Sequence, residues 1–179
     1  FICHRNKLLK YSMKYISLLV LSILIFTTQS CGIYGFTGGS TGDAKTIQID
    51  YFPNNAPLVE PSVSQNFTVA LQDLFLRQTN LSLTTAGGDL HFEGEITGYK
   101  IIPISATADQ RAAQNRLNVS VRVRFYNKLI EEDDFEKTFS FFSDFDANQQ
   151  LTGSALEDAL NEIFERITQD IFNASVAKW

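Results

Sequence analysis

The stretch Arg116-Leu-Asn-Val-Ser-Val-Arg-Val-Arg-Phe-Tyr126 alternates apolar and polar side chains along its whole length. Successive side chains of a β-strand point to opposite faces, so this period of two predicts a half-buried strand over residues 116–126. Arg122 and Arg124 are two residues apart and therefore project from the same face of that strand. The opposite, apolar face consists of Leu117, Val119, Val121, Val123 and Phe125.

The segments on either side of residues 116–126 predict further long strands. Residues 127–134 contain an acidic run and are typical of a hairpin loop, after which residues 135–143 form the return strand. Residues 90–104 predict another long strand before a polar, alanine-rich loop. Gly94 and Gly98 within it indicate a bulge or a bend.

The N-terminal part of the predicted domain adds two shorter strands. Residues 46–52 alternate Ile47, Ile49 and Tyr51 with polar residues, and prolines and asparagines end this strand. Leu81 and Leu83 indicate a second short strand. Residues 105–115 are expected to form the loop between the two long strands.

Two amphipathic helices complete the pattern. One is expected from about Ser62, with Ser62 and Gln65 as a capping box, and the other from Ser154, with Ser154 and Glu157 in the same roles. The resulting order is β-α-β-β-β-β-α. It predicts an α+β two-layer sandwich, in which two helices cover one face of a mostly antiparallel sheet of four to five strands.

Residues 1–30 are typical of a targeting segment. They contain four of the 15 lysines and arginines and none of the 20 acidic residues. The apolar run 15–26 is shorter than the roughly twenty residues that span a bilayer, and it suits the core of a secretory signal peptide. We expect Met13 to be the true start, so that 1–30 comprise upstream residues and a signal peptide that is removed.

The segment Thr27-Thr-Gln-Ser-Cys-Gly32 resembles a bacterial lipoprotein signal. Ser30 and Gly32 fit that signal, whereas Thr28 stands where leucine is usual. The resemblance implies that Cys31 carries the acyl chains of a membrane anchor; the alternative is an ordinary secreted protein with a chance cysteine.

The residues after Cys31 complete the expected domain organisation. The residue directly after Cys31 is not aspartate, and by the same resemblance this implies the outer membrane. No acidic cluster follows Cys31 closely, which favours a lipid-anchored protein on the periplasmic side. Residues 31–45 are rich in glycine and predict a flexible lipidated tether. Residues 46–179 then form a single domain.

The charge and composition of the mature part exclude two classes of protein. From Cys31 onward there are 11 basic and 20 acidic residues, a formal charge of −9. Such an acidic body is a poor partner for nucleic acid, whose binding depends on neutralising phosphates. The whole chain is 44% hydrophobic with 15 phenylalanines, which excludes a disordered protein.

Catalytic and metal-binding motifs are not evident in the sequence. The mature part has one histidine, His91, on a predicted strand, where a lone histidine is most simply part of the scaffold. Asp144, Asp146 and Asn148 resemble the opening of a calcium loop. Gln149 and Ala155 stand where that loop needs Gly and Glu, so we expect no metal site and no cofactor.

The candidate binding residues are Arg122 and Arg124, with Lys128 near the end of the strand. Arginine suits bidentate recognition of phosphate, so a phosphate-bearing ligand is one interpretation. The other is that these arginines pair with acids on neighbouring strands, such as Glu136 or Glu93.

The mature chain resembles the LptE family, the lipoprotein component of the lipopolysaccharide-assembly complex, in its form from non-enteric Gram-negative bacteria. The order of strands and helices agrees with that family. The matching stretches are Cys31-Gly-Ile-Tyr-Gly-Phe-Thr-Gly-Gly39, Lys45-Thr-Ile-Gln-Ile-Asp-Tyr-Phe-Pro-Asn54, Gly88-Asp-Leu-His-Phe-Glu-Gly-Glu-Ile-Thr-Gly-Tyr99, Asn115-Arg-Leu-Asn-Val-Ser-Val-Arg-Val-Arg-Phe125 and Asp170-Ile-Phe-Asn-Ala174.

The resemblance implies a non-enzymatic protein that plugs the LptD β-barrel, helps this barrel to assemble, and binds lipopolysaccharide on its way to the outer leaflet. It does not assign the ligand contacts residue by residue, so Arg122, Arg124 and Lys128 come from the strand pattern alone. Two other classes stay open: a generic periplasm-facing binding or adhesion lipoprotein, and a small hydrolase.

Overall fold

The computed structural model describes residues 41–57, 60–104 and 113–177. The chain divides into two units, Phe1–Phe36 and Thr37–Trp179, and every described residue lies in the second. The predicted signal peptide, Cys31 and most of the tether lie outside the described residues, so these expectations stay predictions. The elements of the second unit are β1 (Thr46–Ile49), α2 (Pro61–Gln78), β2 (Ser82–Thr84), β3 (Leu90–Ile104), β4 (Gln114–Asn127), β5 (Phe135–Asp146) and α3 (Ser154–Ser175).

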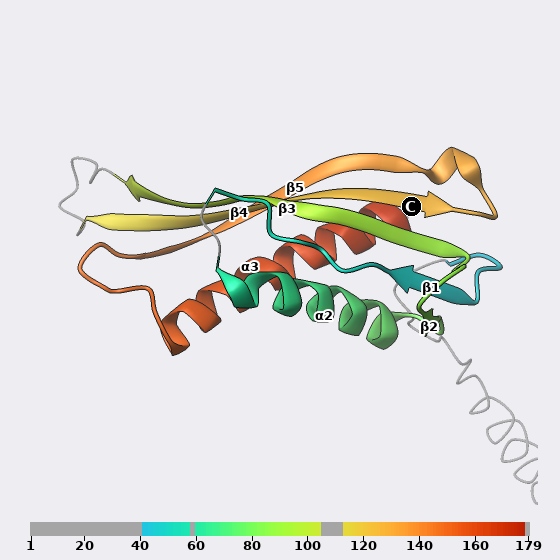
Figure 1. The fold of residues 1–179 in the computed structure, drawn as a ribbon, viewed down its shortest axis with the longest axis horizontal. Coiled ribbons are helices and arrows are strands. Elements are labelled where there is room, and N and C mark those ends of the chain that lie inside the picture. The colour runs from blue at the N-terminus through green and yellow to red at the C-terminus, as the bar shows by residue number, and fades with distance from the viewer. Residues whose placement is uncertain (1–40, 58–59, 105–112, 178–179) are drawn as a thin grey trace, which may run out of the picture. The chain divides into compact units, whose positions relative to one another are not determined.

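The five strands form one sheet in the order β2-β1-β3-β4-β5 (Figure 1). The long strands β3, β4 and β5 pair antiparallel, as their short connections require. The short strand β1 is parallel to both of its neighbours, β2 and β3. Between β1 and β2 the chain passes through α2, and such a crossover is the connection that parallel strands need. The sheet is therefore mixed, and the predicted α+β two-layer sandwich is confirmed.

Both helices lie on the same face of the sheet (Figure 1). The predicted capping boxes are wrong. Helix α2 begins at Pro61 after Glu60, which places Ser62 inside the helix, where its hydroxyl lies 3.4 Å from Glu60 Oε1. Helix α3 begins after Gly153, whose φ of 58° favours glycine, and no side chain caps it. Within the described part of the chain, neither helix combines the length and hydropathy needed to cross a bilayer.

Aromatic side chains join the helices to the inner face of the sheet. Phe75 of α2 contacts Phe92 of β3 and Phe172 of α3, with ring centroids 4.9 and 5.1 Å apart. Phe92 in turn contacts Phe125 of β4 at 4.7 Å. All four rings are almost completely buried, so the core continues from both helices into the centre of the sheet.

Three strands differ clearly from the bounds expected. Strand β1 ends at Ile49 and not at residue 52, and Tyr51, expected on its apolar face, is 56% exposed. Strand β4 begins at Gln114, so the last residues of the predicted loop 105–115 belong to the sheet, and residues 105–112 lie outside the described residues. Strand β5 continues to Asp146, three residues beyond the predicted end. Both extensions pair with each other, Gln114 opposite Asp146, and this long-range pairing is invisible in either local pattern.

The predicted irregularity of β3 is confirmed. The register with β4 shifts between Ile96 and Gly98, which marks a bulge. Gly94 has a different role, because it lies against the backbone of β4 and the ring of Phe52. A Cβ added to Gly94 would overlap the carbonyl oxygen of Arg122 and approach Phe52 Cε1 to 2.7 Å.

We predict that Gly94→Ala lowers the free energy of unfolding by about 1–3 kcal/mol, because a methyl group there forces apart packed backbone and ring. Chemical denaturation measures the loss. Gly98→Ala is the matched control in the same strand. Its nearest neighbours are the side-chain atoms of Ser120 at 3.1 and 3.2 Å, so we expect a smaller loss. Equal losses for the two variants would contradict the close approach at Gly94.

Candidate functional site

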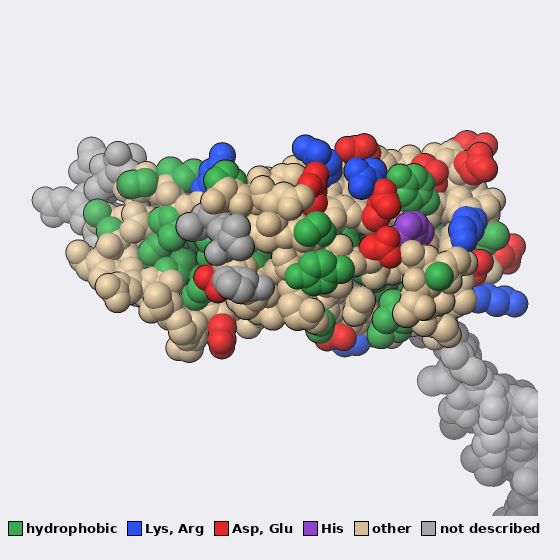
Figure 2. All heavy atoms as spheres, in the orientation of Figure 1, with side chains coloured by type: hydrophobic (Ala, Val, Ile, Leu, Met, Phe, Trp, Pro, Cys, Tyr) green, Lys and Arg blue, Asp and Glu red, His purple; other side chains and the backbone are tan. Residues whose placement is uncertain are grey.

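The outer face of the sheet, opposite the helices, carries most of the charged side chains that the strands hold. In Figure 2, basic and acidic side chains lie close together around the purple histidine side chain. The strand register explains the alternation. Arg124 of β4 lies between Glu93 of β3 and Glu136 of β5, and the next outward residue, Arg122, is opposite Glu95. Each arginine of β4 therefore has a carboxylate opposite it on at least one neighbouring strand, and Arg124 has one on both.

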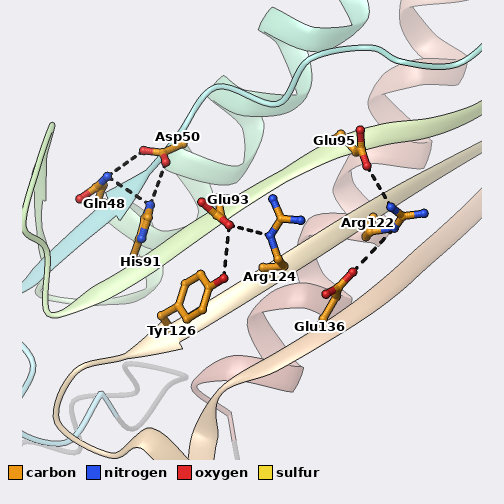
Figure 3. Close-up of polar contacts among 9 residues, drawn as sticks. All are labelled: Gln48, Asp50, His91, Glu93, Glu95, Arg122, Arg124, Tyr126 and Glu136. Atoms are coloured by element: carbon orange, nitrogen blue, oxygen red, sulfur yellow. Dashed lines mark hydrogen bonds and ion pairs between the residues drawn. The ribbon is translucent and has the colours of Figure 1, made fainter.

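Arg124 is held by Glu93. Its Nε donates to Glu93 Oε1 over 2.6 Å, and the hydroxyl of Tyr126 lies 3.3 Å from the same oxygen (Figure 3). The hydrogen bond with Glu93 raises the pKa of the Arg124 guanidinium. Desolvation, together with the charge of Glu93, raises the pKa of Tyr126 above its ordinary value.

Arg122 lies between two carboxylates from different strands. Its Nη1 donates to Glu95 Oε1 over 3.0 Å, and its Nε lies 3.9 Å from Glu136 Oε1 (Figure 3). The other oxygen of Glu95 accepts from the side-chain amide of Asn55 over 2.6 Å. With 44% of its side chain exposed, Arg122 still presents guanidinium surface to solvent.

His91 belongs to a third polar group on the same face. Its Nε2 lies 2.8 Å from Asp50 Oδ2 and 3.1 Å from Gln48 Nε2, and Gln48 Nε2 donates to Asp50 Oδ1 over 2.8 Å. Burial raises the pKa of Asp50, but the hydrogen bonds from Gln48 and His91 outweigh it, so the pKa of this carboxyl lies below 3.8. The expected scaffold role of His91 agrees with these contacts.

One group of potential metal ligands comes together in the described part of the chain. Asp50, His91 and Glu93 each offer a ligand atom, and these atoms lie within 4.8 Å of one another. Imidazole with carboxylates suits zinc or a related transition metal. However, the guanidinium of Arg124 lies 2.6 Å from Glu93, and its positive charge opposes a cation at this place. The contacts are those of a hydrogen-bonded network.

A further arginine lies towards the other end of β4. Arg116 donates from Nε and Nη2 to the two carboxylate oxygens of Asp144 over 2.7 and 2.8 Å, which is a bidentate pair. Its guanidinium also stacks on the ring of Phe142, 3.5 Å from the centroid. Asp144 is the first residue of the stretch that resembles a calcium loop, and both of its carboxylate oxygens accept hydrogen bonds from Arg116.

The structure brings two of the three predicted binding residues together. Arg122 and Arg124 share the outer face, and their pairing with Glu93 and Glu136 agrees with the second interpretation from the sequence. Lys128 lies one residue beyond β4, in the loop, where its backbone N–H donates to the carbonyl of Asp89. The lipid attachment predicted at Cys31 lies outside the described residues.

Sequence reasoning missed Glu95 and Asp50 as members of this face. Glu95 becomes the nearest partner of Arg122 only through the antiparallel register of β3 and β4. Asp50 reaches His91 because β1 pairs parallel with β3, and a parallel pairing between segments 41 residues apart has no local sequence signal.

Comparison with known proteins identifies the family. The family model described as "LptE: Lipopolysaccharide-assembly" matches residues 44–175, which is most of the chain. The chain belongs to the LptE family. This match agrees with the resemblance of the individual stretches, and its limits coincide with the described sheet and helices. LptE proteins are lipoproteins of lipopolysaccharide assembly and are not enzymes. No curated protein matches the chain.

Several solved lipoproteins resemble this LptE protein weakly. An uncharacterized lipoprotein B from Nitrosomonas europaea is 14% identical, with a TM-score of 0.48 over 80% of this chain and 88% of that chain. The rare lipoprotein B from Shewanella oneidensis is 11% identical, with a TM-score of 0.43 over 71% and 89% of the two chains. These likenesses carry no argument about function, so the assignment depends on the family model.

The Arg116–Asp144 pair gives a test by pH. The hydrogen bonds from Arg116 hold the pKa of Asp144 below 3.8. A lowered folded-state pKa stabilises the fold above the unfolded-state pKa, and the stabilisation is lost as the pH falls through the folded-state pKa. We therefore expect Asp144→Asn to lower the Tm slightly at pH 7 and to leave it unchanged near about pH 2. Thermal unfolding followed by circular dichroism measures both values.

Arg116→Gln removes the other half of the pair and is the control. It should lose at least as much Tm at pH 7, because it also removes the stacking of the guanidinium on Phe142, and the double variant should lose no more than Arg116→Gln alone. A loss from Asp144→Asn that persists unchanged in acid would show that the substitution acts through packing and not through the ion pair.

Proposed function

We propose that this protein is an outer-membrane lipoprotein that lies as a plug inside an LptD-like β-barrel, helps this barrel to assemble, and binds lipopolysaccharide during its transport to the outer leaflet. Acyl chains on Cys31 would hold it on the periplasmic side of the membrane. The match of the LptE family model over residues 44–175 carries this proposal.

The outer face of the sheet supports the plug role. No helix of the described residues covers it, and its side chains are mostly charged or polar (Figures 1 and 2). Each arginine on it is paired, so the face offers many hydrogen-bonding groups with little excess charge. Such a surface suits contact with the polar lumen wall of a barrel, where a strongly apolar face would be poorly matched.

The same face supports a role for Arg122 and Arg124 in binding the phosphates of lipopolysaccharide. Their guanidinium groups remain partly exposed, 44% for Arg122 and 39% for Arg124, and arginine forks recognise phosphate in a bidentate way. A phosphate must compete with Glu93, Glu95 and Glu136 for these groups. Lys128, beyond the end of β4, would add a point charge at one side of the site.

We predict that Arg122→Ala combined with Arg124→Ala lowers the affinity for lipopolysaccharide at least about tenfold, because charge-assisted hydrogen bonds to phosphate are lost. Isothermal titration with purified lipopolysaccharide measures the affinity. The Tm should change little, since both side chains are partly exposed.

Two control variants separate a specific site from general charge effects. Arg77→Ala with Arg166→Ala removes the same charge from exposed positions on the helices and should leave the affinity unchanged. Glu93→Gln with Glu95→Gln removes the competing carboxylates and should strengthen binding. If the strand and helix variants lose affinity equally, the outer face is not the binding site.

Depletion of the protein in its own bacterium tests the whole proposal. We expect depletion to reduce both surface lipopolysaccharide and correctly assembled LptD-like barrel, and the barrel to co-purify with the tagged protein. Immunoblotting of the pull-down and labelling of surface lipopolysaccharide measure these outcomes. If no outer-membrane barrel co-purifies, the generic binding or adhesion lipoprotein becomes the better description.

A further inference from the structure

Strand β5 forms one margin of the sheet, and no strand of the described residues pairs with its far side (Figure 1). Unpaired strand edges offer backbone hydrogen bonds to other chains, so proteins shorten them or interrupt them with proline, lysine or a bulge. Over its 12 residues β5 has one lysine, Lys137, and neither a proline nor a shift of register with β4, and phenylalanine is its commonest residue. The opposite margin, β2, has only three residues. One edge is therefore short, and the other is long and left open.

The hydrogen-bond pattern shows which backbone groups of β5 point to its open side. Directly opposite residues of antiparallel strands alternate between hydrogen-bonded and non-hydrogen-bonded pairs. Next to the pair Gln114 and Asp146, the backbone N–H of Ala147 donates to the carbonyl of Ala113, which lies opposite it, over 3.0 Å. The odd-numbered residues of β5 therefore bond to β4. The N–H and C=O groups of even-numbered residues 136–144 point away from the sheet, and we call them the open edge.

Side chains beside the open edge alternate in kind. Those of the even-numbered residues lie on the outer face and are exposed, with Glu136 and Asp144 near the two ends. Those of the odd-numbered residues lie on the helix face, where Phe139 is buried and Phe141 is half-buried. A strand added to β5 would place its own side chains next to these. Apolar side chains suit the helix face of such a strand, and basic ones suit its outer face.

A second copy of this chain matches the open edge poorly. Antiparallel pairing of β5 with itself overlaps most when it is centred on Ser140 or on Phe141. The first register places Glu136 opposite Asp144 of the second copy, and the other places Glu136 opposite Asp146. Like charges directly opposite each other destabilise a pair of strands. The charges therefore favour a different segment, with basic side chains where β5 has acids.

The barrel of the proposed function can supply such a segment only from outside its wall. Each wall strand of a closed barrel is hydrogen-bonded on both sides, so the wall has no free edge for β5. The loops of a barrel protein are not bound in this way, and in plugged barrels loops lie in the lumen. A plug and such a loop thus share the same polar space.

We propose that an extended segment of the barrel protein, outside its wall strands, adds to the open edge as a sixth strand of the sheet. Its basic side chains lie opposite Glu136 and Asp144. The inference rests on the proposed function, because it names the surface by which the plug is held in its barrel. In strand addition, main-chain hydrogen bonds give the affinity, and the alternating side chains give the specificity.

Hydrogen exchange resolved to single residues tests this mode of binding. The tagged protein is compared alone and in the complex with the barrel that co-purifies from its own bacterium. We expect exchange at Thr138, Ser140 and Phe142 to slow at least about tenfold in the complex, because their N–H groups gain acceptors. The N–H groups of Phe139 and Phe141 bond to β4 in both samples, so their exchange is the internal control and should not change.

A proline substitution tests the same edge by removing one hydrogen bond. Ser140→Pro deletes an outward N–H and spares the bonds to β4, and proline is tolerated where the N–H of an edge strand faces solvent. We expect the amount of co-purified barrel to fall at least about fivefold, since a main-chain bond to the added strand is lost. Ser140→Ala keeps the N–H and should retain the barrel.

The outcomes separate this proposal from the proposed function. A barrel that co-purifies without slower exchange at the even-numbered residues would overturn the edge pairing and leave the proposed function standing. If no barrel co-purifies with the parent chain, the proposed function and this occupant fail together. If Ser140→Pro does not fold, hydrogen exchange of the parent chain decides alone.

Discussion

The contact between Phe75 of α2 and Phe92 of β3 is the interaction on which both layers of the molecule depend. Phe75 also contacts Phe172 of α3, and Phe92 also contacts Phe125 of β4, so four buried rings connect two helices to two strands. Burying rings of this size supplies a large part of the hydrophobic stabilisation. Because the rings all lie on one side of the sheet, both helices are drawn to that side.

The other face is left to polar side chains, and the register decides how they meet. Each arginine on β4 pairs with an acid of β3 or β5, so the sheet arginines of this acidic protein are neutralised. An anionic ligand on this face must therefore exchange with Glu93, Glu95 or Glu136. Under the function that we propose, this competition would make contact with lipopolysaccharide weak and reversible.

The two ends of the sheet are also different in kind. At one end, the β4–β5 loop, the residues before β1 and the C-terminal end of α3 surround a hollow beside Leu129 and Ile130. Towards the other, β3 carries the exposed Ile101 and Ile102, and the bidentate Arg116–Asp144 pair joins β4 to β5. A polar face between two unlike ends gives the molecule a direction, which the proposed plug would need in order to meet a barrel in one orientation.

Local periodicity in the sequence was sufficient to predict most of the strands and both helices. Residues 90–104 are strand β3 as predicted, and Gly98 lies at the bulge, because a period of two and a strand glycine are local signals. The helix starts were predicted to within one residue, but the capping residues were not, because serine with a glutamine or glutamate three residues on occurs inside α2 and α3 as well as at helix ends. The sequence by itself determined the α+β class, the two arginines on one face and the resemblance to LptE, because each depends on residues close together in the chain. Only the tertiary structure decided that β1 is parallel to β3, that Asp50 meets His91 and that Glu95 holds Arg122, because pairing between distant segments depends on how the whole core packs.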